Sequence, residues 1–201
     1  MKVLVIGATG TIGTPVTHLL EEKHEVLRAS NSRSPLKVDI TDADSIKQLF
    51  GKVGKVDAVV SVAGHATFRP LASLTDEDFS VSLRNKLMGQ VNLVRLGVGS
   101  VSSGGSFTLS SGILSRAPMP GGVAVSMANA ALEGFVRAAA LEMPRNIRIN
   151  VVAPGWIRET LLAMNLDPSA GTPADLVAQT YVYAVESLIN GQVLDVVATT
   201  R

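Results

Sequence analysis

The stretch "KVLVIGATGTIGTP" at residues 2–15 decides the fold. Its opening apolar run is typical of a strand that is buried on both faces. Gly7, Gly10 and Gly13 follow in the spacing G-x-x-G-x-x-G, at the start of a segment with helical periodicity over 11–22. This combination predicts a tight turn that leads from a strand into a helix.

Each glycine has its own task in such a turn. Gly7 lets the chain leave the strand sharply, Gly10 lets the backbone approach a pyrophosphate, and Gly13 lets the helix pack closely on the sheet. The free amides and the positive dipole end of the helix then face the phosphates. We therefore favour a dinucleotide site over a purely structural turn. Its contacts are expected from Gly7, Thr9, Gly10, Thr11, Ile12 and Gly13.

The end of the next predicted strand, "HEVLRAS" at residues 24–30, bears on the choice between NAD and NADP. A carboxylate there would hold the adenosine ribose hydroxyls. The stretch instead reads Ala29-Ser30-Asn31-Ser32-Arg33, in which the guanidinium and the two serines can hold a 2′-phosphate by charge-assisted hydrogen bonds. We favour NADP(H) on this ground. The alternative is that Arg33 is a single solvated loop charge.

Short apolar runs alternate with longer helix-period segments along the rest of the chain. Further strands are predicted at 35–40, 56–64, 104–112, 147–155 and 191–197. Helices are predicted from Thr41 or Asp42 to Phe50, and over 75–97, 122–143 and 173–189. Strands that are apolar throughout and separated by helices indicate a parallel sheet covered on both faces. The expected fold class is α/β: a single Rossmann-like domain over 1–201, with a doubly wound parallel sheet and helices on both faces.

Composition narrows the function classes. The 201 residues are 46% hydrophobic and 17% charged with a net charge of +1, so we expect a globular chain without a nucleic-acid or membrane partner. The absence of cysteine excludes disulfides and thiolate catalysis and is compatible with a cytoplasmic location. Only four apolar residues follow Lys2 before the first glycine, so no signal peptide is expected.

Several later motifs carry a resemblance that covers nearly the full length. "SVAG" at 61–64, "FTLSSG" at 107–112 and "INVVAPGWIRET" at 149–160, taken with the glycine turn, resemble the short-chain dehydrogenase/reductase family in an extended or atypical form. The resemblance implies adenine contacts from Asp39 and Ile40. It also implies further cofactor contacts from Ala63, Gly64, Pro154, Gly155, Ile157 and Thr160.

The family's catalytic pair, Tyr-x-x-x-Lys, is missing. Matching "NAALEGF" at 129–135 to the family's K-A-A-L-x-x-F run places Asn129 at the lysine and Val125 at the tyrosine. Valine cannot transfer a proton to a substrate oxygen. Asn129 can still bind ribose hydroxyls, but it brings no positive charge. Tyr181 and Tyr183 lie in a late predicted helix, where we expect them to serve in packing.

Three residues remain as catalytic candidates. Ser111 best matches the family's active-site serine, although a strand-end serine that satisfies backbone groups is an equal alternative. Asn85 and Lys86 compete for the slot of the family's helix asparagine: counting back from Gly89 favours Lys86, and residue type favours Asn85. An inward Lys86 would supply the charge that position 129 lacks, whereas an outward one would be an ordinary surface lysine.

The histidines and the tryptophan give less information about function. His18, His24 and His65 show no metal-ligand spacing, so no metal is expected. We expect His18 and His24 to be exposed at the first helix and its exit, and His65 to be a loop residue, with a position near the cofactor as the alternative. Trp156 follows Pro154-Gly155, where it either lines a pocket or packs in the core.

The sequence therefore supports an NADP(H)-dependent oxidoreductase that moves hydride to or from a carbonyl or an activated C=C group by a non-standard proton route. The alternative is an inactive NADP(H)-binding sensor or scaffold, and a third interpretation is a relic that binds no nucleotide. The substrate would be a small molecule. The family associates through the helices that correspond to 75–97 and 122–143, which implies a homo-oligomer, either a dimer or a tetramer.

Overall fold

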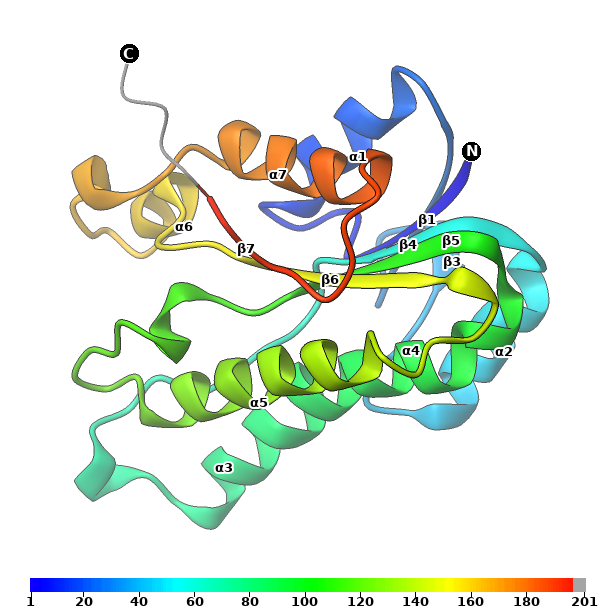
Figure 1. Ribbon diagram of the computed structural model, residues 1–201. Coiled ribbons are helices and arrows are strands. Elements are labelled where there is room, and N and C mark those ends of the chain that lie inside the picture. Colours follow the sequence, from blue (N-terminus) through cyan, green and yellow to red (C-terminus); the bar gives the residue numbers. More distant parts are fainter. Residues whose placement is uncertain (197–201) are drawn as a thin grey trace.

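The computed structural model describes residues 1–196, which form a seven-stranded sheet in the order β3-β2-β1-β4-β5-β6-β7 (Figure 1). All neighbouring strands run parallel. The strands are β1 Lys2–Ile6, β2 Glu25–Ser30, β3 Leu36–Lys37, β4 Val56–Ser61, β5 Val101–Ser110, β6 Arg148–Ala153 and β7 Val193–Asp195. The order reverses between β1 and β4, so the doubly wound parallel sheet is confirmed. The last predicted strand included Val197, which lies outside the described residues.

Helices cover both faces of this sheet (Figure 1). One face carries α1 Gly13–Glu21, α6 Arg158–Ala163 and α7 Ala174–Glu186; the other carries α2 Ala43–Val53, α3 Asp76–Ser82, α4 Gln90–Gly97 and α5 Val123–Ala139. Successive strand residues point to opposite faces. Thus Leu4 and Ile6 of β1 belong to the core under α2, α4 and α5, whereas Val3 and Val5 belong to the core under α1 and α7. Because alternate residues of β1 are buried in two different hydrophobic cores, the whole strand has to be apolar.

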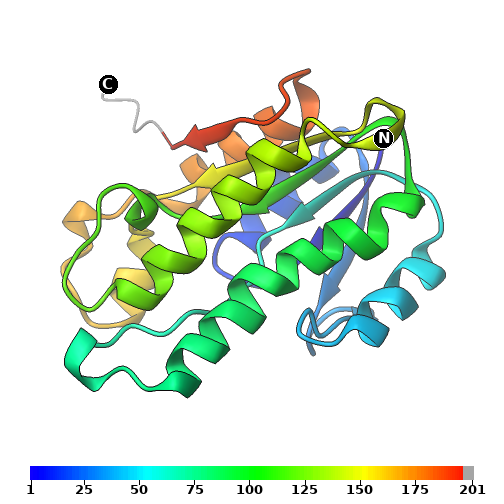
Figure 2. The same cartoon turned by 60° about the horizontal axis from the view of Figure 1, so that its bottom comes forward.

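The predicted helix over 75–97 is divided. It begins with a capping box in which Thr75 and Asp78 satisfy each other's backbone N–H groups. A π-helical turn over Leu83–Gly89 then separates α3 from α4. A π turn accommodates an extra residue and changes the direction of the side chains that follow. Figure 2 shows this composite helix running beside α5, and the π turn is in contact with α5.

Local sequence signals predicted where some helices begin, but they did not predict helix α6. The side chain of Asp42, rather than that of Thr41, caps α2 by accepting from the N–H of Asp44 at 2.8 Å. Helix α6 was not predicted, because it is a single short segment with no periodicity of its own. Among residues 1–196, no helix is both long enough and apolar enough to cross a membrane.

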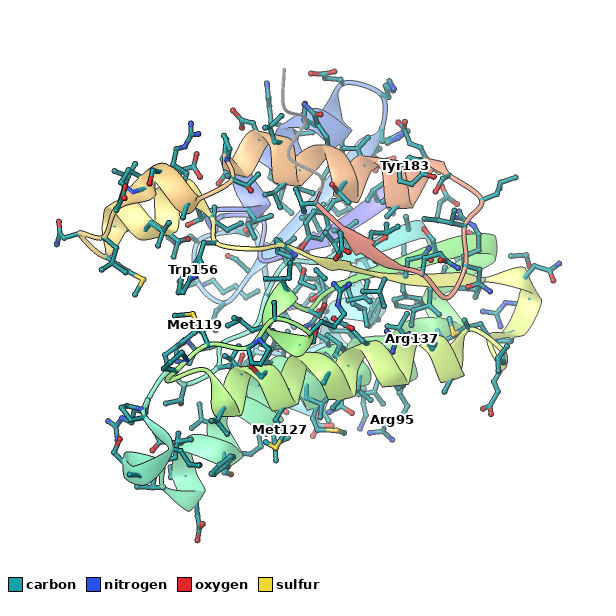
Figure 3. The ribbon with its side chains drawn as sticks, turned by 60° about the vertical axis from the view of Figure 1, so that its left-hand side comes forward. Arg95, Met119, Met127, Arg137, Trp156 and Tyr183 are labelled. Atoms are coloured by element: carbon teal, nitrogen blue, oxygen red, sulfur yellow. The ribbon has the colours of Figure 1, made fainter. Side chains whose placement is uncertain are left out.

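The two tyrosines of α7 have different environments. Tyr181 is fully buried, its hydroxyl lies 2.6 Å from the hydroxyl oxygen of Ser110, and burial raises the pKa of the phenol. Its packing role is confirmed. Tyr183 is 55% exposed on the outer side of α7, so the prediction that it packs in the core was wrong (Figure 3). Helix periodicity explains the difference, because residues two positions apart on a helix point to opposite sides.

Candidate nucleotide and catalytic site

The glycine turn lies at the carboxyl end of β1, at the reversal of strand order. Gly7 has a φ of +86°, and a Cβ there would lie 2.9 Å from the backbone nitrogen of Ala63. A Cβ on Gly13 would lie 1.9 Å from the carbonyl oxygen of Gly7, so this glycine is needed for the helix to start beside the strand. A Cβ on Gly10 would meet only that same oxygen, at 3.3 Å. The fold itself therefore requires the first and third glycines far more than the second, which leaves space for a ligand.

A cavity lies outside this turn, and we call it the Arg33 cavity. It is lined by Thr9, Gly10, Thr11, Thr14, Pro15, Arg33, Glu159, Ala174 and Asp175. The guanidinium of Arg33 reaches back across the turn and donates to the carbonyl oxygen of Thr9 at 3.2 Å. Ile12 and Gly13 form the first turn of α1, whose leading amides have no acceptors within the helix. Ser32 is exposed and lines neither this cavity nor the two described next.

The second cavity, the Asp39 cavity, lies between the ends of β1, β2 and β4. Its lining consists of Ile6, Gly7, Ser30, Asn31, Val38, Asp39, Ile40, Ala63, Gly64, His65 and Asn85. The backbone N–H of His65 donates to the Asn85 amide oxygen at 2.7 Å. Asn85 thus holds the loop after β4, and it does not line the cavity that contains Ser111.

The third cavity has a volume of about 270 Å³, and we call it the Trp156 cavity. It is lined by Phe68, Lys86, Ser111, Gly112, Ile113, Leu114, Val125, Asn129, Pro154, Gly155, Trp156, Ile157 and Thr160. The rings of Phe68 and Trp156 lie 5.7 Å apart at an interplanar angle of 33°. Figure 3 shows Trp156 in the segment that follows the yellow strand β6. The walls are therefore aromatic and aliphatic, with a small number of polar groups between them.

Lys86 is one of these polar groups. Its ammonium donates to the carbonyl oxygens of Ser110 at 3.4 Å and Ser111 at 3.3 Å. The side chain is partly exposed through the cavity, yet protein surrounds its ammonium densely, and this burial lowers the pKa to about 8. Gln90 supports the geometry, because its amide nitrogen donates to the Lys86 carbonyl at 3.0 Å within the π turn. Of the two alternatives at this slot, Lys86 is the one that enters the cavity, and it is not a solvated surface lysine.

Ser111 has an ionic neighbour that the sequence analysis missed. Its hydroxyl donates to a carboxylate oxygen of Glu133 at 3.0 Å, and both residues are buried. Glu133 follows Asn129 by one helical turn of α5, so both face the sheet. The signal was available in the sequence, since this helix places one carboxylate among otherwise apolar or small residues on its inner face. Such a charge needs a partner, and Ser111 is one of its partners.

Asn129 and Val125, which the sequence alignment assigned to the family's lysine and tyrosine positions, both line the Trp156 cavity. Val125 presents only methyl groups to the cavity. The amide nitrogen of Asn129 donates to the Gly112 carbonyl at 3.3 Å, whereas its amide oxygen is buried without a partner among the described residues. A buried acceptor that lacks a donor is costly unless a ligand supplies one. The hydroxyls of a nicotinamide ribose are donors of this kind, so this residue fits the group that the resemblance implies.

The histidines lie apart from the Trp156 cavity. His18 is exposed, as predicted, and His65 is an exposed loop residue after β4 that also lines the Asp39 cavity. His24 is an exception, because its side chain is only 10% exposed and contacts Glu186 at 3.2 Å. Trp156 is a cavity wall, which decides between the two roles that the sequence left open.

Comparisons with known proteins agree with this geometry. Residues 11–183 match a family described as enoyl-(acyl carrier protein) reductase. The crystal structure of the protein lin1944 from Listeria innocua is 43% identical and has a TM-score of 0.94, over 98% of this chain and 100% of that one. A small-chain dehydrogenase in complex with NADPH is 26% identical with a TM-score of 0.86, over 98% of this chain and 96% of its own.

A further relative is the hydroxynaphthalene reductase arp2 of Aspergillus fumigatus. It is 29% identical over 65% of this chain and 50% of its own length. The chain thus spans about half the length of this curated relative. The NADPH-bound neighbour supports the prediction of the cofactor. The parallel sheet, the glycine turn and the matched family description agree, and the chain belongs to the short-chain dehydrogenase/reductase family of oxidoreductases.

Proposed function

We propose that the protein is an NADP(H)-dependent reductase, acting as a single domain, that transfers hydride to a carbonyl or an activated C=C group and uses Lys86 as its proton donor. One observation carries this proposal: an ammonium group enters the cavity where the usual tyrosine and lysine are absent. Lys86 comes from the helix next to α5, so the charge reaches the site from a different element. NADPH would supply the hydride, and the chain supplies the remaining groups.

The three cavities suit the successive parts of a dinucleotide. The Arg33 cavity would take the pyrophosphate and the 2′-phosphate, with Arg33 in its lining, Asn31 in the adjoining Asp39 cavity, and Ser32 between them on the exposed loop after β2. The Asp39 cavity would take the adenine, between Ile40 and Gly64. On the nicotinamide side, the contacts we assign are Asn129, Pro154, Gly155, Ile157 and Thr160.

Hydrogen-bond directions favour Lys86 over Ser111 as the proton donor. The hydroxyl proton of Ser111 is already donated to Glu133. An ammonium has three N–H groups, and Lys86 uses two of them on backbone carbonyls, which leaves one for a substrate oxygen. A donor whose pKa is about 8 transfers its proton near neutral pH far more readily than an ordinary lysine. Asn85, our other candidate at this slot, instead positions the loop at His65.

The competing proposal is a nucleotide sensor without turnover, which the methyl groups of Val125 favour. One comparison separates the two. NADPH binding would be measured by fluorescence, and NADPH consumption would then be followed with ketones, quinones and enones. Consumption with any of these substrates supports the reductase. Binding without consumption on all of them supports the sensor, and failure to bind contradicts both.

We also propose that the chain forms a homo-oligomer through α5 and the α3–α4 segment. The outer face of α5 exposes Val123 and Met127, and the neighbouring π turn exposes Met88. Met127 projects away from the sheet (Figure 3). Between these side chains, α5 exposes alanine and glycine, which permits close helix packing. Light scattering on the purified protein distinguishes a dimer, a tetramer and a monomer, and a monomer would contradict the proposal.

A further inference from the structure

The carboxylate of Glu133 is surrounded by four donors. One of its oxygens accepts from the hydroxyls of Ser111 at 3.0 Å and Ser115 at 2.6 Å. The other oxygen faces the guanidinium groups of Arg137 at 3.4 Å and Arg116 at 3.8 Å. The side chain of Glu133 is only 3% exposed, so these contacts replace water around a buried charge.

This arrangement determines the direction of the Ser111 hydrogen bond. An ionised carboxylate accepts hydrogen bonds and has none to donate. The hydroxyl of Ser111 has a single proton, so that proton points to Glu133. What Ser111 offers to the Trp156 cavity is therefore a lone pair. In the usual arrangement of such a site a serine would donate to the substrate carbonyl, and here that donation is blocked.

The polar groups near the reacting position are thus one donor and one acceptor. The donor is the remaining N–H of Lys86, whose nitrogen lies 3.3 Å from the carbonyl oxygen of Ser111. The acceptor is the hydroxyl oxygen of that same Ser111. A plain ketone can use only the donor. A substrate that carries a hydroxyl beside its carbonyl can use both groups at once.

Given the reductase function proposed above, we propose that Glu133 is a positioning residue that makes Ser111 an acceptor, and that the cavity selects α-hydroxy ketones. The ketone oxygen accepts from Lys86 and the neighbouring hydroxyl donates to Ser111. On reduction the carbonyl carbon gains a hydride as NADPH is oxidised to NADP⁺. The C=O π pair forms the new O–H bond with the proton of Lys86, and the amine regains a proton from water. The product is a vicinal diol.

The side chains that line the Trp156 cavity indicate which group the α-hydroxy ketone used as a probe should carry. Phe68 and Trp156 form an aromatic pair, and Ile113 and Leu114 add aliphatic surface. An aryl group fits such walls better than a charged or sugar-like group. We therefore choose α-hydroxyacetophenone and its methyl ether, α-methoxyacetophenone. The two differ in the group on the oxygen beside the carbonyl: a hydrogen that can be donated to Ser111, or a methyl group that cannot.

Binding can be measured without turnover. Trp156 is the only tryptophan of the chain, and it lines the cavity, so its fluorescence reports a bound ketone. Each ketone is titrated into the protein saturated with NADP⁺. We expect the hydroxy ketone to bind about tenfold tighter than the methyl ether, which is the size of one hydrogen bond. Equal affinities, or failure of both ketones to bind, would overturn the inference.

Variants separate positioning from structure. Glu133→Met removes the acceptor, frees the Ser111 proton and is expected to bring the affinity ratio close to one. Ser111→Ala is expected to do the same, and it serves if the methionine variant does not fold. Glu133→Gln retains one carbonyl oxygen for the serines and should keep the ratio within about threefold. The matched control is Ser115→Ala. Ser115 donates to the same carboxylate but does not line the cavity, so this variant should keep the wild-type affinity ratio of the two ketones.

The outcomes keep this inference distinct from the proposed function. If the protein consumes NADPH with other carbonyls but does not discriminate between the two acetophenones, the reductase stands and the role of Glu133 is refuted. If the wild type discriminates but reduces no carbonyl, the acceptor role of Ser111 stands and the reductase fails. A ratio that Glu133→Met and Ser111→Ala leave unchanged would also refute the role of Glu133.

Discussion

The proton-donor role of Lys86 predicts a specific pH dependence. Burial disfavours the charged form of this side chain and lowers its pKa to about 8, so the ammonium is lost at a lower pH than in an exposed lysine. Only the ammonium can donate to the substrate oxygen. We therefore expect the turnover number for carbonyl reduction to be highest below about pH 8 and to fall as the pH rises through that value.

The magnitude follows from the protonated fraction. With a pKa of about 8, roughly nine tenths of Lys86 is protonated near pH 7, and roughly one tenth near pH 9. Turnover at saturating NADPH should thus fall roughly tenfold for each pH unit above the pKa. Lys86→Met removes the donor, and we expect turnover to drop by about 10²- to 10⁴-fold, the usual contribution of a positioned acid.

The assay follows NADPH consumption from about pH 6 to about pH 10 with the most active carbonyl of the panel. Lys86→Arg keeps a positive charge that does not titrate in this range, so its residual rate should be flat. The control is Lys47→Met on α2, where the side chain of the lysine is 60% exposed and pairs with Asp44. A flat profile for the wild type, or full activity of Lys86→Met with unchanged NADPH binding, would refute the reasoning.

Other predictions concern the cofactor and the missing pair. Gly10→Ala should lower the melting temperature only slightly, because its Cβ would press on the Gly7 oxygen alone, at 3.3 Å, yet weaken NADPH binding at least tenfold; thermal shift with and without NADPH checks both. Arg33→Ala should weaken NADPH binding by about 10- to 100-fold and leave NADH binding unaltered, and equal losses in fluorescence titrations would contradict the NADP assignment. Val125→Tyr with Asn129→Lys should raise carbonyl reduction, and a folded, NADPH-binding double variant with unchanged rates would count against the alignment.

Regular elements were predictable because their signals are local. The apolar run before Gly7 specifies a strand buried on both faces, and the glycine spacing specifies the turn after it. The first residue of a helix was predictable where the sequence has a recognisable N-cap residue, as at Thr75. Helix α6 has no such periodic signal, and it was missed.

The sequence predicted which residues belong to the site better than it predicted the directions in which their side chains point. Ser111 and Asn129 lie around one cavity as the motifs implied, and Trp156, whose role the sequence left open, lines it too. The choice between Asn85 and Lys86 depends on a rotation of about 100° per helical residue, and a π turn alters that rotation. Periodicity in the sequence does not reveal where a single extra residue is accommodated.

The sequence alone determined the alternation of strands and helices and the glycine turn, because these depend on neighbours along the chain; the absence of the tyrosine and lysine pair stays a prediction from the alignment. Tertiary structure decided which groups meet at the end of β5. Lys86 reaches it from the π turn, and Glu133 reaches it from α5 to take the Ser111 proton. These contacts join residues more than twenty positions apart, and a buried charge finds its partners only when the packed sheet brings them within hydrogen-bond distance.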